Sequence, residues 1–336
     1  MKKPPQPAPR ETAFPRRLPL GLHSLVLRIV VVIQCFGVGG RYLFSSMETE
    51  SDVYGWLYFD CHWSESLAQS IDNAGALMTL VAGGLLCLTG WRMTKPMNES
   101  PRDEILRRFD RAAAWWVALW MLLNAAAHMM RAAVFAELSL AEHAVRYAAP
   151  IALALFSGAR DRAPGGTGHV NDSDTGDLFG GHATKVAPKL DVDPGAFSQP
   201  RRTRVAIHVL VVAAAFTFAA HGYKAFECYA PFTDLILLSD MQWTDTGCTQ
   251  TTAEQLLVVI GIADIVVALA LLLIRSRLAA FYMVVWGSVT AASRMTAFGF
   301  DAWPETLIRI ANGGVPLAIL IYWMTIRKPV TPTSSS

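Results

Sequence analysis

The sequence predicts an all-α integral membrane protein whose eight transmembrane helices form two tandem four-helix bundles, with both termini in the cytoplasm. Three observations predict it. Only 17% of the 336 residues are charged, whereas about a quarter are charged in a typical soluble domain. Apolar blocks of about 20 residues alternate with short charged loops, which is typical of polytopic helical membrane proteins. The second half of the chain also repeats a pattern found in the first.

The apolar blocks place the spans in order along the chain. The first four are expected at about 24–45, 66–90, 113–133 and 140–158, and the second four at about 205–227, 254–274, 278–298 and 306–326. Segment 100–112 is amphipathic, so we expect a cytoplasmic interfacial helix that leads into the third span. The apolar pieces Val53–Phe59 and Phe232–Leu238 predict short helices in the first and fifth loops.

The repeat is visible as residue matches at nearly constant spacing. Phe36, Gly40 and Phe44 match Phe218, Gly222 and Phe226 at an offset of 182, and Asp60 and Trp63 match Asp240 and Trp243 at 180. Trp120, Ala125, Ala126, Met129 and Pro150 match Trp286, Ala291, Ala292, Met295 and Pro316 at 166. Since each copy has an even number of spans, both copies enter the membrane in the same direction, which predicts a parallel repeat.

Loop charges predict the orientation. Lys and Arg are concentrated in the N-terminal tail and the even-numbered loops, while the first and fifth loops are acidic. By the positive-inside rule, both termini face the cytoplasm of a multi-pass plasma (inner) membrane protein. The predicted organisation is a cytoplasmic tail at 1–22, a first bundle at 23–158, a disordered cytoplasmic linker at 159–204, a second bundle at 205–326 and a cytoplasmic tail at 327–336.

Polar residues within the spans of the second half predict a binding site. Buried ionisable groups are costly in a membrane and therefore mark functional sites by default. From the depth of each residue along its helix, we expect a pocket in the outer leaflet formed by His221, Lys224, Asp264, Arg294, Arg309 and Asn312. Its positive charge would suit an anion or a polar head group, such as a quinone carbonyl, a sulfur oxyanion or a lipid phosphate. Asp264 would be the partner of His221 or the counter-ion of Lys224 or Arg294.

The first half also has polar residues at outer-leaflet depth in its spans, namely Arg41, Asn124, His128, His143 and Arg146. In the repeat, Arg294, Arg309 and Asn312 take the positions of His128, His143 and Arg146. A structural role is the alternative for each residue. Lys224 and Arg41 near span ends would then reach the head groups, Arg309 would pair with Glu305, and the asparagines would join helices.

Cysteines and motifs limit the chemistry. Cys228 and Cys248 bracket the fifth loop and are candidates for a disulfide, with Cys61–Cys248 as the competing pair. No phosphate-binding loop, dinucleotide fingerprint, zinc-protease motif or nucleophile elbow occurs. We expect no metal site and no nucleic-acid partner.

The second half resembles the DoxX-like family of four-span bacterial membrane proteins over about 205–325. The resemblance rests on His221-Gly222 with Lys224, on Gly261-Ile-Ala-Asp264, and on Arg309, Asn312 and Pro316 in the last span. In the first half, Gly39 replaces the histidine and Thr79 lies near the place of the carboxylate, so the second copy is expected to be the working one. The resemblance implies a redox system, with quinone as the cofactor and a redox protein as partner beside the membrane lipids.

Two other functions remain open on the sequence. Parallel repeats are common in transporters, so the chain is alternatively a transporter or lipid-handling protein, which requires polar residues that continue to the cytoplasmic side. The third possibility is a non-catalytic assembly subunit of a membrane complex, in which the polar groups only hold helices together.

Overall fold

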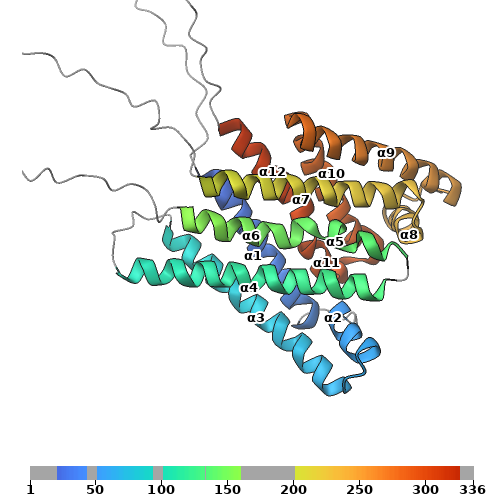
Figure 1. Cartoon of the computed structure of the whole chain (residues 1–336). Coiled ribbons are helices and arrows are strands. Elements are labelled where there is room, and N and C mark those ends of the chain that lie inside the picture. The colour runs from blue at the N-terminus through green and yellow to red at the C-terminus, as the bar shows by residue number, and fades with distance from the viewer. Residues whose placement is uncertain (1–20, 44–50, 94–100, 133, 160–200, 326–336) are drawn as a thin grey trace, which may run out of the picture.

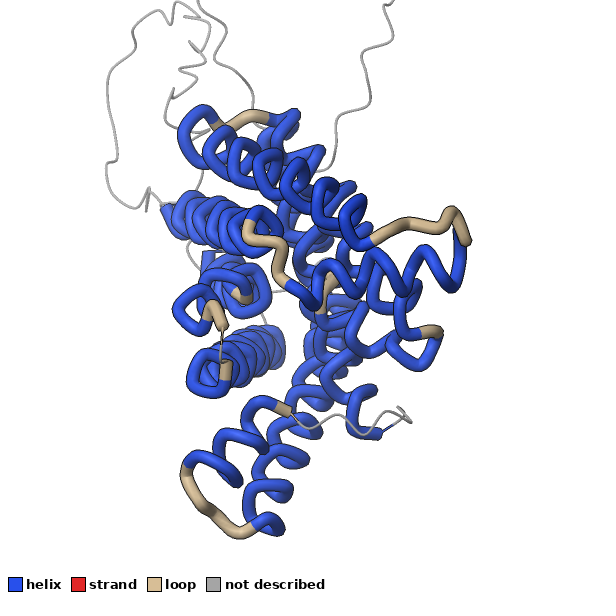
Figure 2. The backbone as a smooth tube through the Cα atoms, turned by 90° about the vertical axis from the view of Figure 1, so that its right-hand side faces the viewer, coloured by secondary structure: helices blue, strands red, loops and turns tan. Residues whose placement is uncertain are grey.

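The computed structural model describes residues 21–43, 51–93, 101–132, 134–159 and 201–325. In this part of the chain the secondary structure is helical and contains no strand (Figure 2). The N-terminal tail, the linker between the halves and the C-terminal tail predicted from the sequence lie almost entirely outside the described residues.

The helices of the first half follow the predicted spans closely. The long helices are α1 (Leu22–Leu43), α3 (Glu65–Met93) and α4 (Pro101–Arg131), followed by the short α5 (Ser139–Glu142) and then α6 (Ala144–Ala159). Between α1 and α3 lie α2 (Asp52–Gly55) and a π-helical turn, Trp56–Asp60. The predicted interfacial helix at 100–112 is not separate, because α4 runs without a break through it into the third predicted span.

The second half has the same order of elements. Its long helices are α7 (Arg201–Phe226), α9 (Gln250–Ile274) and α10 (Arg277–Phe298), followed by α11 (Trp303–Ile308) and α12 (Ala311–Thr325). Helix α8 (Ala230–Ser239) and the π-helical turn Asp240–Thr244 lie between α7 and α9, as α2 and its π-helical turn lie between α1 and α3. The short helices predicted at Val53–Phe59 and Phe232–Leu238 are therefore confirmed.

The last span of each half is broken at the same place in the repeat. His143 ends α5 and Arg309 ends α11, and both have φ near −90° and ψ near 0°. Helices α11 and α12 are bent by 44° relative to each other. About two turns later, Pro150 and Pro316 lie inside α6 and α12 and cannot donate to the carbonyls of Arg146 and Asn312.

The two halves share one hydrophobic core. Helix α1 packs on α11 and α12 of the second half, and α7 packs on α5 and α6 of the first. These two interfaces join equivalent elements, and the buried core cluster runs continuously from Leu27 in α1 to Tyr322 in α12. Figure 1 shows the long helices side by side, with α2 and α8 at the end of the bundle opposite to the start of α1 and α7.

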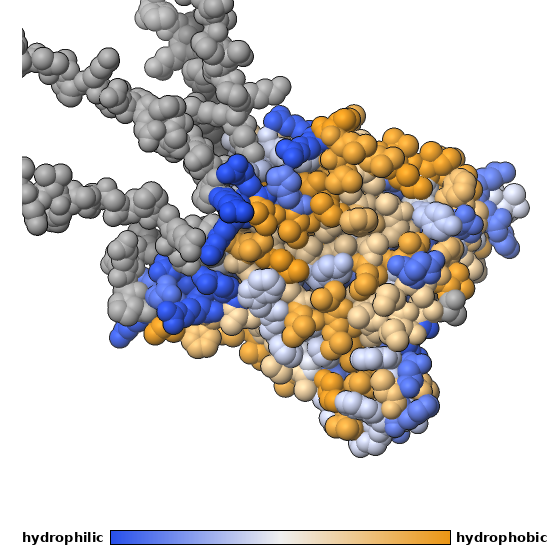
Figure 3. Space-filling model, in the orientation of Figure 1, coloured by the Kyte–Doolittle hydropathy of each residue, from blue (hydrophilic) through white to orange (hydrophobic). Residues whose placement is uncertain are grey.

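The surface carries a broad apolar region between more hydrophilic ends (Figure 3). Large side chains such as Leu88, Leu119, Val259 and Leu278 are each at least 60% exposed. Among the described residues, α1, α3, α4, α7 and α9 are long and apolar enough to cross a membrane, and the bent pair α11–α12 is a sixth candidate. Helices with such exposed apolar faces are typical of membrane proteins.

Candidate functional site

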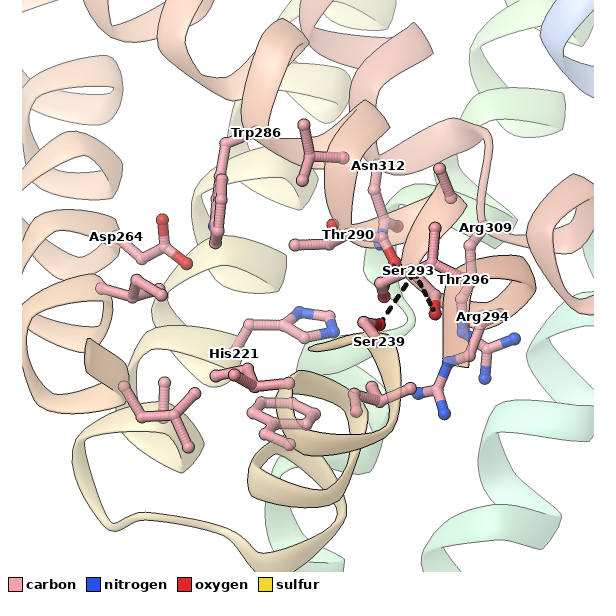
Figure 4. A pocket seen from close by; sticks show the side chains of 18 of the residues that line it. His221, Ser239, Asp264, Trp286, Thr290, Ser293, Arg294, Thr296, Arg309 and Asn312 are labelled. Atoms are coloured by element: carbon pink, nitrogen blue, oxygen red, sulfur yellow. Dashed lines mark hydrogen bonds between the residues drawn. The ribbon is translucent and has the colours of Figure 1, made fainter. Parts of the chain in front are cut away.

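A cavity of about 600 Å³ lies among the helices of the second half. It is lined from α7, α8, α9, α10 and α12, and by the Asp240–Cys248 segment. Five of the six residues predicted for this half line it: His221, Asp264, Arg294, Arg309 and Asn312. Figure 4 shows Asp264 and Trp286 at one end of the cavity, Arg294 and Arg309 at the other, and His221 between them.

A close contact between α7 and α9 positions His221 and Asp264. A Cβ added at Gly261 would lie 2.6 Å from the carbonyl oxygen of Gly222, so neither glycine leaves room for a side chain. Small residues allow helix backbones to approach each other in this way. His221 precedes one glycine and Asp264 lies one turn after the other, so the contact brings both side chains to the cavity.

His221 is held in a defined orientation. Its Nδ1 lies 2.8 Å from the carbonyl oxygen of Thr217, and its ring stacks on Phe232 with 5.9 Å between the centroids. A carbonyl oxygen only accepts hydrogen bonds, so Nδ1 carries the hydrogen. The other nitrogen, Nε2, lies 3.6 Å from a carboxylate oxygen of Glu142. His221 therefore connects the cavity with the interface between the halves.

Asp264 does not have any of the partners predicted from the sequence. Its carboxylate accepts a hydrogen bond from the Tyr282 hydroxyl at 3.1 Å, across the α9–α10 interface. His221 and Lys224 both pair with Glu142 instead, and Arg294 has no ion pair with Asp264. The prediction that Asp264 neutralises one of these groups was wrong, because α9 directs it toward α10 at the far end of the cavity (Figure 4).

The other end of the cavity is cationic. Arg309 donates to the carboxylate of Glu305 and, at 3.0 Å, to its carbonyl oxygen, which matches the structural alternative for Arg309. Arg294 has a buried Nε without an acceptor, and Asn312 is only 4% exposed with no donor to its Oδ1. A Cβ added at Gly287 would lie 2.4 Å from the Asn312 carbonyl oxygen, so α10 and α12 hold these groups through a tight contact.

Lys224 lies outside the cavity, in the interface with the first half. Its ammonium group donates to Glu142, its side chain is 3% exposed, and it lies 5.1 Å from the centre of the Tyr229 ring. Lys224 therefore neither lines the cavity nor reaches the membrane surface, and both expectations for it were wrong. Glu142 was not among the residues predicted from the sequence, although a carboxylate at the start of a predicted span, next to His143, was a usable signal.

The first-half residues do not form a copy of the site. Arg41 crosses to Glu305 of α11 at 3.5 Å, and Asn124 donates to the Trp120 carbonyl of its own helix at 2.8 Å. His128 lies 3.2 Å from Asp52, and its ring is 5.1 Å from that of His143. Arg146 lies close enough to Arg309 of the second half for their two positive charges to repel each other.

Side chains fill the first-half region equivalent to the site. A Cβ at Gly39, the counterpart of His221, would lie 3.0 Å from the Leu80 side chain, and Trp120 packs directly on Gly75. Thr79, near the place of Asp264, accepts a hydrogen bond from the Trp116 indole at 3.3 Å. The first half thus lacks both the histidine and the carboxylate, and bulky residues occupy their surroundings.

Asp240 organises the segment that covers the cavity. Its carboxylate accepts hydrogen bonds from the Thr246 hydroxyl at 2.6 Å, the Thr246 amide at 3.0 Å and the Cys248 amide at 2.8 Å. Together with the bond from the Thr244 hydroxyl, these hold the pKa of Asp240 well below its usual range. Asp240, Thr246 and Cys248 all line the cavity.

The cysteines are free thiols in the structure. The Cys228 thiol lies 3.7 Å from the carbonyl oxygen of Glu254, and that of Cys248 lies 3.7 Å from the carbonyl oxygen of Thr249. The Cys228–Cys248 disulfide suggested by the sequence is therefore not formed, and Cys61 is also free. Within the described residues no group of His, Cys, Asp and Glu could hold a metal ion.

No family model, curated protein or solved structure matches the chain. The resemblance to the DoxX-like family therefore remains a prediction from the residues quoted for it. The site has to be interpreted from its own geometry.

Proposed function

We propose that the chain is a multi-pass membrane protein of eight spans that binds a small molecule in the second-half cavity. The observation that carries this proposal is the cavity itself. Polar residues from α7, α9, α10 and α12 converge on a space large enough for a ligand, and apolar side chains make up much of the remaining wall. Concave, largely apolar sites with a few convergent polar groups are the usual form of small-molecule sites.

The repeated order of elements supports eight spans in a parallel duplication. Helices α6 and α10 fall outside the set of clear membrane candidates, but they take the places of α12 and α4 in the repeat. The starts of α1 and α7 lie at the same end of the bundle (Figure 1). With the positive loops at that end, both termini are assigned to the cytoplasmic side of the plasma membrane.

The ligand proposed from the sequence is a quinone or a small anion. The guanidinium groups of Arg294 and Arg309 and the amide of Asn312 are donors suited to a carbonyl or an anionic oxygen. In this proposal His221 exchanges a proton with a ligand group and with Glu142, which lies 3.6 Å from its Nε2. A place in a membrane redox system, with a quinone and a redox partner protein, is the role that the DoxX-like resemblance implies, and we retain it within this proposal.

The polar groups at the end of the bundle opposite to the cavity argue against the transporter alternative. There, Asp110 accepts hydrogen bonds from Arg28 at 2.5 Å and 2.9 Å, from Thr89 at 2.5 Å and from Ser157 at 2.6 Å. These residues bind one another and so form a closed network rather than groups directed at a path. The assembly-subunit alternative predicts that variants that fill the cavity lower stability and partner binding, and that no ligand is bound in the wild type.

Native mass spectrometry of the detergent-purified chain, with identification of bound lipids and quinones, tests the proposal. Ile260 lines the cavity, whereas Ile262 on the same helix is 51% exposed. We expect a defined molecule on the wild type and on Ile262→Trp, and its loss from Ile260→Trp and from His221→Ala. The same bulk lipids on all four proteins would refute ligand binding in the cavity.

A further inference from the structure

The cationic end of the cavity belongs to a larger cluster of charges between the two halves. Arg294 and Arg309 line the cavity. Arg146 of α6, from the first half, lies close enough for its charge to interact with both arginines and with Glu142 and Glu305. The cluster has these members: Arg41, Glu142, Arg146, Lys224, Arg294, Glu305 and Arg309.

Positive charge exceeds negative charge in this cluster. Glu305 pairs with Arg41 and Arg309, and Glu142 pairs with Lys224. Arg146 and Arg294 have no carboxylate within 4.0 Å among the described residues, and each has a buried Nε without a hydrogen-bond acceptor. Five cations thus face two carboxylates.

A buried guanidinium nitrogen without a hydrogen-bond acceptor is costly. Removal of an ion from water without a partner costs several kcal/mol even after relaxation, and polar groups inside a membrane protein usually find partners. Native structures leave few buried donors unpaired, and each such donor calls for an explanation. An anionic group placed at Arg294 would supply both the missing charge and the missing acceptor.

The rest of the cavity determines what this anion is attached to. From Arg294 the wall continues along Phe218, Leu257, Ile260, Trp286 and Val289. A small inorganic anion would leave this apolar space unfilled, and a neutral quinone would leave the charge uncompensated. The two ends together fit a molecule with an acidic head group and a hydrocarbon body.

We propose that the cavity binds an anionic amphiphile, with its acidic head group at Arg294 and Arg309 under the field of Arg146, and its hydrocarbon body along α9 and α10. This inference rests on the proposed binding function of the cavity, but it replaces the quinone or small anion proposed from the sequence with a ligand of another chemical class. The head group is a carboxylate or phosphate, and its source is either a free single-chain acid or a two-chain membrane lipid. The first half contributes to the site through Arg146, although its own copy is filled.

The test uses tritiated palmitate and the full chain in dodecyl maltoside, with scintillation proximity as the readout. Methyl palmitate has the same hydrocarbon chain without the charge and is the matched competitor. A charged hydrogen bond contributes about 1.5–3 kcal/mol, which is roughly tenfold or more in affinity. We expect palmitate to compete at least about tenfold better than its ester, Arg294→Gln to remove this preference, and Arg294→Lys to retain most of it.

Two further variants distinguish the electrostatic effect of Arg146 on the head group from a non-specific loss of binding. Arg146→Gln should weaken palmitate binding about threefold and leave the ester unchanged, because it acts on charge alone. Arg131→Gln, at the exposed end of α4 beside Asp60, should bind palmitate like the wild type. Displacement by phosphatidylglycerol as well as palmitate would identify a two-chain lipid, and displacement by palmitate alone a single-chain acid; both support the inference.

The failing outcomes are distinct. Equal competition by acid and ester, with both lost in Ile260→Trp, would overturn the acidic ligand and leave the cavity as a neutral site. A preference for the acid that persists in Arg294→Gln would place the head group elsewhere and also overturn the inference. If palmitate does not bind at all, this inference fails, and the mass-spectrometric comparison of Ile260→Trp with Ile262→Trp decides the cavity proposal by itself.

Discussion

Lys224 of α7 donates a hydrogen bond to Glu142 of α5, which lies 82 positions earlier in the chain. The pair is buried, with side chains 3% and 13% exposed, and it joins the second half of the molecule to the first. Arg41 and Glu305 form the equivalent connection between α1 and α11 at 3.5 Å. In each case a cation near the end of the first long helix meets a carboxylate of the short helix in the other half.

Removing one member of the buried pair should destabilise the protein strongly. Lys224→Met or Glu142→Gln leaves the other group buried and deprived of its charged partner, which typically costs about 3–5 kcal/mol. The double variant Lys224→Met/Glu142→Gln should recover part of this loss, because no unpaired charge remains between these two positions. These losses are measured as changes in the free energy of unfolding in mixed micelles. Strictly additive losses in the double variant would show that the two groups are not coupled.

How far the sequence predicts this structure depends on the range of each interaction. The long apolar helices were predictable because hydropathy is local to each segment. The convergence of His221, Arg294, Arg309 and Asn312 was predictable from depth along each helix. The Lys224–Glu142 pair was not, because it depends on how two halves dock, and no local pattern encodes that docking.

The orientation of side chains around a helix was the other source of error. Depth predicts that Asp264 lies deeper than His221, near the middle of its span, but it does not predict the rotation about α9 that directs Asp264 to Tyr282. The break at His143 and Arg309 was also missed, although Pro150 and Pro316 at equivalent positions carried a signal. Each proline lies about two turns after its break and removes the helical hydrogen bond to the carbonyl of Arg146 or Asn312, which weakens the first turn of α6 or α12.

The contact between Gly222 and Gly261 predicts sensitivity to a single methyl group. In Gly261→Ala the new Cβ would meet backbone atoms of Gly222 and Phe226 at 2.6 Å, so α7 and α9 must separate. Overpacking of this kind costs about 1–3 kcal/mol. We expect lower thermal stability and weaker ligand binding, because His221 and Asp264 shift relative to each other.

Gly84→Ala is the matched control for this variant. Gly84 lies within α3 and has no atom within 4 Å of an added Cβ. Alanine favours a helix over glycine by about 1 kcal/mol, so this change should be neutral or stabilising. Equal losses in the two variants, measured by the same thermal unfolding assay, would contradict the role assigned to the close contact.

Two carboxylates on α4 should contribute differently to the free energy of unfolding, because one is buried and the other is exposed. Asp110 is fully buried and bonded to Arg28, Thr89 and Ser157. Asp110→Ala removes the carboxylate that pairs with Arg28 and should cost about 3–5 kcal/mol. Glu104 also pairs with arginines, Arg107 and Arg108, but at the exposed start of the helix.

Glu104→Ala is therefore expected to change the stability far less than Asp110→Ala, because exposed ion pairs contribute little. Both variants are measured by unfolding in mixed micelles under the same conditions. Asp110 and its partners Arg28, Thr89 and Ser157 lie on four helices, α4, α1, α3 and α6. Similar losses of stability in the two variants would mean that the Asp110 network stabilises this packing no more than a surface ion pair does.

The lowered pKa of Asp240 predicts acid resistance of the segment that covers the cavity. The ionised carboxylate accepts the bonds from Thr244, Thr246 and Cys248, so its folded pKa lies below its unfolded value. The stabilisation is then present above the unfolded pKa, about 3.9 for aspartate, and is lost as the pH falls through the lower folded pKa. Limited pepsin digestion should leave this segment of the wild type intact at about pH 4 and cleave it progressively toward pH 2. Asp240→Asn removes the titrating carboxylate and leaves a weaker hydrogen-bond acceptor, so in this variant the segment should already be cleaved at about pH 4. Identical cleavage profiles for the wild type and the variant would mean that Asp240 does not order the segment.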